Sequence, residues 1–440
     1  MNLLLRLLFL LYFITPLSIE SQTILKEEPL VKVRIIYTLD SLNIIFNDKW
    51  NLNDSATNNL FNFSSSDSIS FTIKDNMIEL NYDNAVVSSL PLKNIFLKCI
   101  TDSGTLKIKN VPYGIGWWWE GVEDRVYEGE FEISVNTNKK FDVIITLPLE
   151  KYLCGVVPYE IGSDAPLEAL KAQVIAARSE TVDALVTGKY KGENFDLCAD
   201  VECQVFAGNN KRTDITDQAV KDTKGLCLFY GDKVIGAYYA SNCGGMSEKV
   251  ENVWPDRSDA VPYWSSHFDS DDELNFNPQI NPREWIECNP DVFCNPYYHP
   301  ELSEWSKKNF RWQVEMTSDE LTKNLNAIKG IGRLIEIIPL NRGNSGRIIK
   351  ARFIGEEDSL ELNSELEIRK IKNPPFRSSC FVVEKVIDDQ LNENFIFKGA
   401  GWGHGVGMCQ SGAVARAYSG QMFKEILKHY FPETEIKKVF

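Results

Sequence analysis

The run from Ala165 to Leu185 constrains the fold more than any other part of the 440-residue chain. Its apolar side chains recur at the spacing of one helix face, at Leu167, Leu170, Val174, Ala177, Val182 and Leu185. Ser163 and Asp164 are suitable N-caps, and Pro166 fits the first turn of a helix. Gly188 provides a C-terminal stop. The pattern predicts a long helix whose packing fixes the segment just ahead of it.

The N-terminal third of the chain has a different pattern. Residues 29–147 consist of short β-branched and aromatic runs separated by Asn, Asp, Ser and Gly, which is typical of strands and turns. The clearest runs are Val31–Tyr37, Ser68–Ile73, Glu130–Val135 and Phe141–Ile145. Later in the chain we expect a hairpin around Gly231-Asp232, strands at Leu334–Pro339, Arg347–Ile354 and Phe381–Ile387, and a helix over Gln421–Tyr430.

These patterns predict an α+β fold, with a β-rich N-terminal domain followed by a mixed α/β domain that carries a long inserted loop. We place the β-rich accessory domain at residues 23–146 and the second domain at residues 147–440. Residues 260–308 form the long loop or insertion, because Pro, Asn, Asp and aromatic residues follow one another there with little periodicity. Within it, a local disulfide between Cys288 and Cys294 is the simplest interpretation.

Residues 1–22 have the features of an export signal. Arg6 is their basic residue, a short apolar stretch follows, and Pro16 interrupts it. A cleaved signal peptide is expected, with an uncleaved N-terminal anchor as the alternative, and the protein is expected to be secreted or in the cell envelope. The net charge of −15 argues against a nucleic-acid partner, which would require a basic face.

Glu160 is the carboxylate with the most unusual local sequence. It ends the string Tyr-Leu-Cys-Gly-Val-Val-Pro-Tyr-Glu at residues 152–160, and Ile161 follows it. Apolar neighbours disfavour the charged form of a carboxylate, so its pKa is expected to rise toward the range of a general acid. The alternative is a solvated surface glutamate with no catalytic role.

Two glycine-rich strings stand out. In Gly399–Gly412, glycines permit close approach of the backbone, and His404 lies between two of them. His404 is expected either to orient substrate or handle a proton, or to be satisfied locally in a tight turn. Gly114–Trp119 ends in three adjacent tryptophans, which could stack on sugar rings, although core packing or a domain contact is favoured.

All ten cysteines follow the predicted signal. In an oxidising compartment this even number is typical of disulfides. However, Cys198 and Cys203 have the spacing of a zinc-ligand pair, and Cys243 and Cys409 are possible further ligands. Four thiolates would form a closed structural zinc site. The alternative is that the four cysteines form two disulfides.

Five strings, taken in order, resemble the SpoIID/LytB family (stage II sporulation protein D). They lie at residues 147–160, 168–178, 203–208, 239–245 and 401–410, and Arg377-Ser-Ser adds a shorter match. The resemblance extends over about residues 147–440, and more loosely over the β-rich segment before it. No Ser-His-Asp order, HExxH motif or phosphate-binding loop stands out beside these strings.

The resemblance implies a peptidoglycan lytic transglycosylase that cleaves MurNAc-GlcNAc bonds, particularly in glycan strands without stem peptides. Glu160 falls on the family's catalytic glutamate and would act as the single general acid and base, giving 1,6-anhydro-MurNAc ends. Residues that fall in family motifs and are candidates for substrate binding are Arg178, Gln204, Ser241, His404 and Gln410.

The resemblance also bears on cofactors and partners. Catalysis is expected to need no cofactor, while some family members carry zinc near the counterpart of Cys198 and Cys203, with histidine among the ligands. Glu202 stands here where histidine often precedes the second cysteine. The alternative function is a non-catalytic, wall-binding enhancer of a peptidoglycan amidase. A zinc hydrolase is disfavoured because four thiolates leave no open coordination position.

Overall fold

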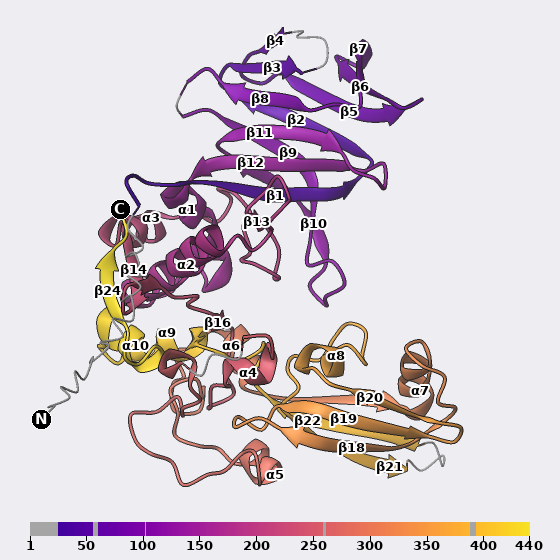
Figure 1. The fold of residues 1–440 in the computed structure, drawn as a ribbon, viewed down its shortest axis with the longest axis vertical. Helices are drawn as coiled ribbons and strands as arrows, with labels where there is room; N and C mark the ends of the chain where they lie inside the picture. Colours follow the sequence, from indigo (N-terminus) through magenta and orange to yellow (C-terminus); the bar gives the residue numbers. More distant parts are fainter. Residues whose placement is uncertain (1–24, 56–59, 102, 258–260, 388–392) are drawn as a thin grey trace, which may run out of the picture.

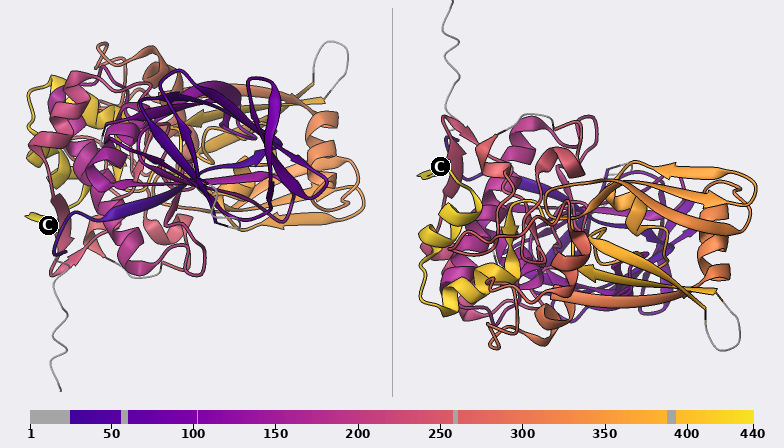
Figure 2. Two further views of the ribbon diagram at one scale, coloured as in Figure 1. Left: turned by 90° about the horizontal axis from the view of Figure 1, so that it is seen from above. Right: turned by 90° about the horizontal axis from the view of Figure 1, so that it is seen from below.

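The computed structural model describes residues 25–55, 60–101, 103–257, 261–387 and 393–440. In Figure 1 the chain is C-shaped, with an upper and a lower β-rich lobe that project from a helical layer. In Figure 2 the N-terminal strands lie in front of the lower lobe, drawn in orange, when seen from above, and the lower lobe lies in front when seen from below. The predicted signal peptide or anchor, residues 1–22, lies outside the described residues.

The upper lobe consists of two sheets, with the strand orders β13-β1-β12-β11-β8-β3-β4 and β10-β9-β2-β5-β6-β7. The strands of the first sheet are β1 (Leu30–Leu39), β3 (Trp50–Asp54), β4 (Leu60–Phe63), β8 (Ile95–Cys99), β11 (Glu130–Val135), β12 (Phe141–Pro148) and β13 (Leu197–Cys198). The strands of the second are β2 (Ser41–Asn47), β5 (Ser68–Lys74), β6 (Met77–Tyr82), β7 (Ala85–Pro91), β9 (Thr105–Tyr113) and β10 (Gly121–Tyr127). Pairing is antiparallel except between β13 and β1.

Alternation of buried and exposed residues explains why these segments form sheets. In β1, Val31 and Val33 are buried, whereas Leu30 and Lys32 face outward. The inward side chains, with Trp50 among the largest, belong to one hydrophobic core that continues into the helical layer. Each such apolar side chain stabilises the fold by roughly 1.5–3 kcal/mol when fully buried. The predicted β-rich N-terminal segment is confirmed.

The helical layer lies at the left in Figure 1 and connects the two lobes. It contains α1 (Leu149–Glu160), α2 (Leu167–Thr187), α3 (Asp214–Asp222), α9 (Gln410–Tyr418) and α10 (Phe423–Tyr430). A three-stranded sheet accompanies it, in the order β15 (Lys233–Val234), β14 (Leu226–Tyr230) and β24 (Glu435–Lys438). The predicted hairpin is therefore present, since Phe229 pairs with Val234.

Helix α2 confirms the predicted long helix, and Gly188 ends it in the left-handed conformation at φ 69°. Its start differs from the prediction. Pro166 is the N-cap and has no side-chain capping bond, so Ser163 and Asp164 lie in the turn before the helix and do not cap it. Helix α1 was not predicted, because almost every residue from Leu149 to Pro158 is buried and no polar face marks a helical period.

The lower lobe has its own hydrophobic core, in which Trp312, Phe353 and Phe397 are buried. Its two three-stranded sheets are ordered β17 (Arg311–Thr317), β22 (Glu393–Ala400), β21 (Phe381–Ile387) and β18 (Leu334–Arg342), β19 (Ile348–Gly355), β20 (Ser359–Leu362). Helices α7 (Ser318–Asn326) and α8 (Glu365–Arg369) accompany them. The three strands predicted here are confirmed.

The predicted insertion contains little regular structure, as expected. Its elements are η1 (Pro262–Trp264), α5 (Pro282–Glu287) and α6 (Glu304–Phe310), and α4 (Val250–Val253) precedes it. Nearby, β16 (Tyr239–Ala240) pairs in parallel with β23 (Met408–Cys409). This short pairing brings two motifs together that are separated by most of the lower lobe. In the described part of the chain, no helix is both long and apolar enough to cross a membrane.

Candidate functional site

Glu160 is the last residue of α1 and is half-buried. One carboxylate oxygen, Oε1, accepts a hydrogen bond from the Val205 backbone N–H at 2.6 Å. The other, Oε2, accepts one from the Gln410 side-chain amide at 3.4 Å. Because α1 packs against the sheet and against α2, the carboxylate has a fixed position at the junction of three chain segments.

The surroundings of Glu160 favour its protonated form. Burial raises the pKa of this carboxyl to about 7, and the hydrogen bonds from Val205 and Gln410 lower it in part. A pKa near neutrality lets one group hold a proton and release it during the same turnover. The predicted rise in the pKa of Glu160 is present in the structure.

Gln410 orients this carboxylate. It is the first residue of α9 and only 3% exposed. Its amide nitrogen also donates to Oε1 of Gln173, at 3.3 Å, and Gln173 is fully buried. Gln410 thus contacts the proposed reactive group from a rigid helix start. Its side chain has little exposed surface of its own.

Glu180, on α2, is a second acid that the sequence analysis missed. Burial raises its pKa to about 8, the charge of Lys189 lowers it, and the charge of Glu160 raises it further. Glu180 is therefore largely protonated at neutral pH. Its position three residues after Ala177 places it on the predicted apolar face of the helix, and this sequence signal could have identified it.

Two predicted substrate contacts are corrected. Arg178 is fully buried, and its guanidinium binds both carboxylate oxygens of Glu150, at 2.9 and 2.7 Å. Gln204 is 1% exposed and bonds to Thr181 and to the Tyr239 hydroxyl, each at 2.9 Å. Neither side chain is open to a substrate, because both are buried and their polar groups are hydrogen-bonded to other groups of the protein.

His404 is held neutral in its loop. Burial lowers its pKa to about 3, and the positive charges of Arg347 and Arg369 lower it further. Its Nδ1 accepts the Val406 backbone N–H at 3.0 Å, and its ring centroid lies 4.9 Å from that of Trp254. The histidine is thus satisfied locally and does not gain a proton near neutral pH, which favours an orienting role over proton handling.

The loop around His404 requires glycine. Gly405 has φ 80°, and a Cβ there would lie 2.5 Å from the Arg347 guanidinium carbon. Ser241, the remaining predicted contact, lies at the same junction, where its backbone oxygen accepts both the N–H and the hydroxyl of Ser411. The Ser241 hydroxyl itself is buried and has no hydrogen-bond partner among the described residues.

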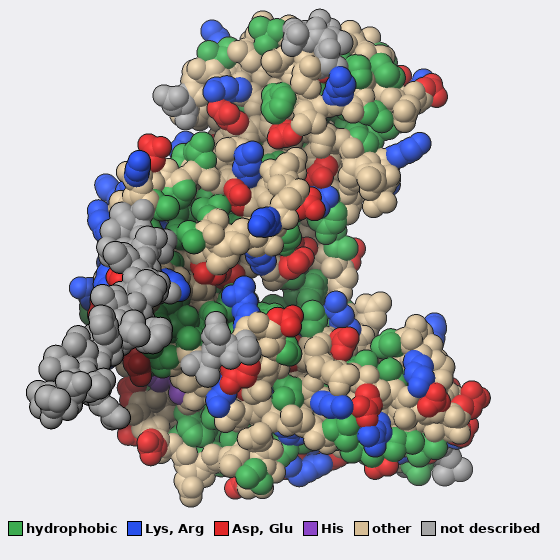
Figure 3. All heavy atoms as spheres, viewed as in Figure 1, with side chains coloured by type: hydrophobic (Ala, Val, Ile, Leu, Met, Phe, Trp, Pro, Cys, Tyr) green, Lys and Arg blue, Asp and Glu red, His purple; other side chains and the backbone are tan. Residues whose placement is uncertain are grey.

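The three adjacent tryptophans make a contact between the lobes. They lie between β9 and β10, and the rings of Trp118 and Trp119 are each 5.3 Å from that of Trp402 in the His404 loop. Trp305 of the insertion lies 5.7 Å from the same ring. The string thus contacts the second half of the chain, which agrees with the favoured interpretation of core packing or a domain contact. Trp118 and Trp305 remain 37% and 38% exposed, and Figure 3 shows the molecule hollowed between the two lobes.

The cysteines are arranged as predicted only in part: Cys243 and Cys409 lie together, but apart from Cys198 and Cys203. Cys243, Cys294 and Cys409 form a buried group with Asp269, and their ligand atoms all lie within 4.8 Å of one another. Such a group could hold a metal ion such as zinc. Cys288 instead donates to the Trp285 backbone oxygen at 3.1 Å, so the predicted local disulfide between Cys288 and Cys294 is wrong.

Cys198 and Cys203 stand apart from this group. Their sulfur atoms lie 2.9 Å from each other, and the Tyr190 hydroxyl lies 3.4 Å from the sulfur of Cys203. Within the described ranges, no third cysteine, histidine or carboxylate joins them in a ligand group. A single four-thiolate site shared with Cys243 and Cys409 is therefore not formed. All ten cysteines belong to the described residues, and each is a free thiol.

Comparison with known proteins gives the following similarities. Residues 137–230 match the family described as Stage II sporulation protein (SpoIID), and residues 248–407 match a domain of unknown function, DUF8618. An uncharacterized protein of Brachyspira hyodysenteriae is 27% identical over 367 residues, 81% of this chain and 85% of the relative. The amidase enhancer of Bacillus subtilis is 27% identical over 64% of this chain, which spans 40% of that relative. Stage II sporulation protein D of the same organism is 25% identical, over 66% of this chain and 75% of the relative.

Proposed function

Because the chain belongs to the SpoIID family of cell-wall proteins, we propose that it is a lytic transglycosylase acting on peptidoglycan. It cleaves the bond between MurNAc and GlcNAc in glycan strands, preferentially strands without stem peptides. Its place of action is extracytoplasmic, either secreted or in the cell envelope. Among described residues, the observation that carries the proposal is the half-buried Glu160, whose pKa of about 7 is set by burial.

The reaction needs one carboxyl group. Protonated Glu160 donates its proton to the glycosidic oxygen, so the bond between C1 of MurNAc and the oxygen of GlcNAc breaks. The C6 hydroxyl of the same MurNAc attacks C1, and Glu160, now a carboxylate, accepts the hydroxyl proton. The products are a 1,6-anhydro-MurNAc end and a free GlcNAc end, and Glu160 is again protonated. Water is not consumed.

The electrostatics of the site support this scheme over a two-carboxylate hydrolysis. Glycosidases that use two carboxylates require the second one to be ionised as a base or nucleophile. The other acid coupled to the site is Glu180, and its pKa of about 8 keeps it largely protonated at neutral pH. Acid catalysis of this kind supplies about 10²–10⁴-fold in rate, all of which rests here on Glu160.

The aromatic contact between the lobes supports a carbohydrate substrate. Trp118 and Trp305 both contact Trp402 and keep more than a third of their surface exposed. Exposed indole faces provide apolar area for stacking against the faces of sugar rings. We infer that these rings hold the glycan beside the carboxylate, with His404 fixing the loop that carries Trp402.

Catalysis in this proposal uses no cofactor, since acid, nucleophile and base come from Glu160 and the substrate itself. Incubating the purified protein with denuded glycan strands, followed by mass spectrometry of the products, tests the reaction. The expected products end in 1,6-anhydro-MurNAc, and Glu160→Gln abolishes them. Absence of product from the wild type would overturn the enzymatic proposal.

The similarity to an amidase enhancer favours one alternative, a wall-binding protein that stimulates a partner amidase without cutting glycan. The same preparation separates the two functions when a peptidoglycan amidase and intact walls are added. Stimulation that survives Glu160→Gln, together with no anhydro product from the wild type, would support the alternative. Loss of anhydro product in this variant, with a product-forming wild type, supports the transglycosylase.

A further inference from the structure

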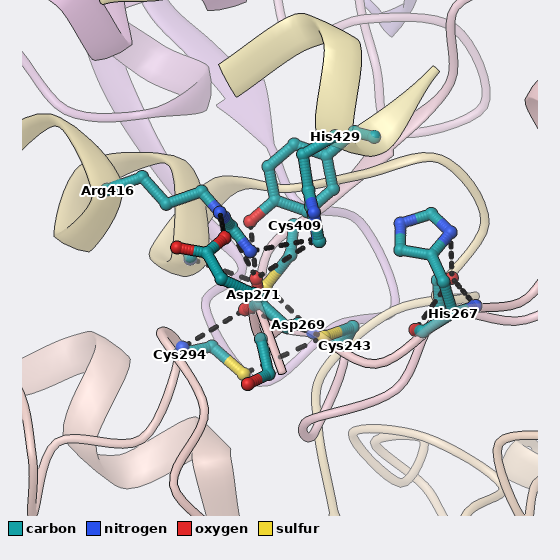
Figure 4. Close-up of polar contacts among 12 residues, drawn as sticks. Cys243, His267, Asp269, Asp271, Cys294, Cys409, Arg416 and His429 are labelled. Carbon is teal, nitrogen blue, oxygen red and sulfur yellow. Dashed lines mark hydrogen bonds and ion pairs between the residues drawn. The ribbon is translucent and has the colours of Figure 1, made fainter. Parts of the chain in front are cut away.

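Four ligand-type side chains, those of Cys243, Asp269, Cys294 and Cys409, lie together in the interior of the molecule (Figure 4). Cys243 follows β16, Cys409 belongs to β23, and Asp269 and Cys294 belong to the insertion. All four residues are buried, with exposed fractions of 0–3%. The sulfur of Cys243 lies 3.6 Å from that of Cys294 and 4.0 Å from Oδ2 of Asp269.

Hydrogen bonds from neighbouring groups hold two of the four side chains, Cys409 and Asp269, in place. The sulfur of Cys409 accepts the backbone N–H of Cys243 at 3.2 Å and that of Gly412 at 3.5 Å. The two carboxylate oxygens of Asp269 have different partners. Oδ1 accepts a hydrogen bond from the Tyr430 hydroxyl at 2.7 Å, while Oδ2 faces the thiols and accepts one from the Cys294 N–H at 3.0 Å. Hydrogen bonds to the far sides of the ligands are the usual second layer of a protein metal site.

A glycine is required at position 412, because a larger residue would collide with the Asp269 and Tyr430 side chains. A Cβ at this position would lie 2.2 Å from both Oδ2 of Asp269 and the Tyr430 hydroxyl. One disulfide would pair only two of the three thiols and leave the third beside Oδ2 of Asp269, whose other oxygen, Oδ1, lies 3.5 Å from the Arg416 guanidinium. A divalent cation satisfies all four groups at once, since thiolates and a carboxylate are its preferred partners.

We propose that Cys243, Asp269, Cys294 and Cys409 bind one zinc-class divalent cation in a closed tetrahedral site. Four protein ligands fill the coordination shell, so the ion has a structural role and no open position for catalysis. The proposal does not rest on the transglycosylase reaction. It assigns the metal to Cys243 and Cys409, which the sequence analysis names as possible further ligands, together with Asp269 and Cys294, and not to the pair Cys198 and Cys203.

A metal bound here would link the insertion to the segments around β16 and β23. Asp269 and Cys294 come from the insertion, where helices and strands are sparse. Cys409 directly precedes Gln410, which donates to Glu160. A bound ion would therefore fasten the insertion to the start of α9 and fix the side chain that orients the carboxylate.

Metal analysis of the full chain, purified under reducing conditions without chelator, tests the proposal. We expect about one zinc per chain, lost in Cys294→Ser and Cys409→Ser. Cys227→Ser is the matched control, because Cys227 is a fully buried free thiol outside the group, and it retains the metal. Cys198→Ser also retains it. Replacing zinc by cobalt in the wild type adds thiolate-to-metal charge-transfer absorption, which reports the ligands without any variant.

Three results would overturn the proposal. The first is a wild type that binds neither zinc nor cobalt with thiolate absorption. The second is unchanged metal content in a folded Cys294→Ser or Cys409→Ser protein. The third is a native disulfide that joins two of the three cysteines, detected by peptide mapping without reduction. Loss of zinc from Cys198→Ser, with retention in Cys409→Ser, would assign the metal to the other pair.

Discussion

Replacing Glu160 by Gln is expected to stabilise the fold at neutral and alkaline pH while it removes activity. Burial raises the pKa of Glu160 from 4.5 to about 7. A carboxyl group whose pKa is higher in the folded than in the unfolded state contributes stability below the unfolded value, and this stability is lost as pH rises through the folded value. The wild type therefore loses stability, through ionisation of Glu160, as the pH rises from 4.5 to about 7.

The size of the effect follows from the shift. Each pKa unit corresponds to about 1.4 kcal/mol, so the full shift is worth roughly 3 kcal/mol, and solvent screening at a half-buried group reduces this to roughly 1–3 kcal/mol. Glutamine does not titrate, keeps the shape of the side chain, and can still accept the Val205 N–H bond. We expect the free energy of unfolding of Glu160→Gln to exceed that of the wild type by this amount near pH 8, and by much less near pH 5.

Urea unfolding of the wild type and of Glu160→Gln, near pH 5 and near pH 8, measures how the difference between their free energies of unfolding changes with pH. Glu150→Gln is the control of opposite sign, because Glu150 is the partner of the fully buried Arg178. Its loss leaves a buried charge unpaired and should destabilise the fold by about 3–5 kcal/mol. The reasoning fails if Glu160→Gln and the wild type differ by the same amount at both pH values.

Other expectations concern activity. Gln410→Ala should move the alkaline limb of the rate profile to higher pH, because the Gln410 hydrogen bond lowers the pKa of Glu160; an unchanged profile would deny Gln410 this role. Glu180→Gln should keep its rate within roughly 10-fold, against about 10²–10⁴-fold lost in Glu160→Gln, since Glu180 is already protonated near neutrality. The wild-type profile of rate against pH should show no ionisation of His404 near neutral pH, because the pKa of His404 lies at about 3. A second ionisation in the profile, near the ordinary pKa of histidine, would contradict this. Trp305→Ala should raise KM for glycan strands and leave kcat nearly unchanged, as loss of uniform binding does.

Alternating strands and the amphipathic helix were predictable because their periodicity is local. Val31–Tyr37 lies inside β1, and the predicted helix at residues 165–185 differs from α2 by two residues at each end. Helix α1 escaped prediction because it is buried on nearly all sides. Helix α9 begins inside the glycine-rich string, where glycines suggested only a loop. The two-residue strands β16 and β23 exist through tertiary pairing, which no local pattern encodes.

The candidate site was predictable only in part for the same reason. The apolar neighbours of Glu160 are adjacent in sequence, so the direction of its pKa shift could be inferred. Its contact with Gln410 spans 250 positions and required the fold. Membership of a motif did not distinguish the buried Arg178 and Gln204 from surface residues, because a motif can preserve packing as well as binding.

Local spacing could not show which cysteines lie together in the fold. The local spacing of Cys198 and Cys203 favoured them as metal ligands, whereas the four-residue group draws Cys243, Asp269, Cys294 and Cys409 from three distant segments. Cys294 had been paired with Cys288 because the two are close in sequence. The fold instead turns Cys294 inward toward Cys243, and Cys288 toward the backbone of α5.

The protonation of Glu160 is the claim on which the proposed chemistry depends most. Carbon-13 NMR titration of glutamate side-chain carboxyls, with Glu160→Gln used to assign the signal, measures it directly. The expected result is a resonance that titrates at about pH 7 in the wild type and is missing from the variant. A Glu160 carboxyl that titrates near 4.5, like an exposed glutamate, would contradict the account.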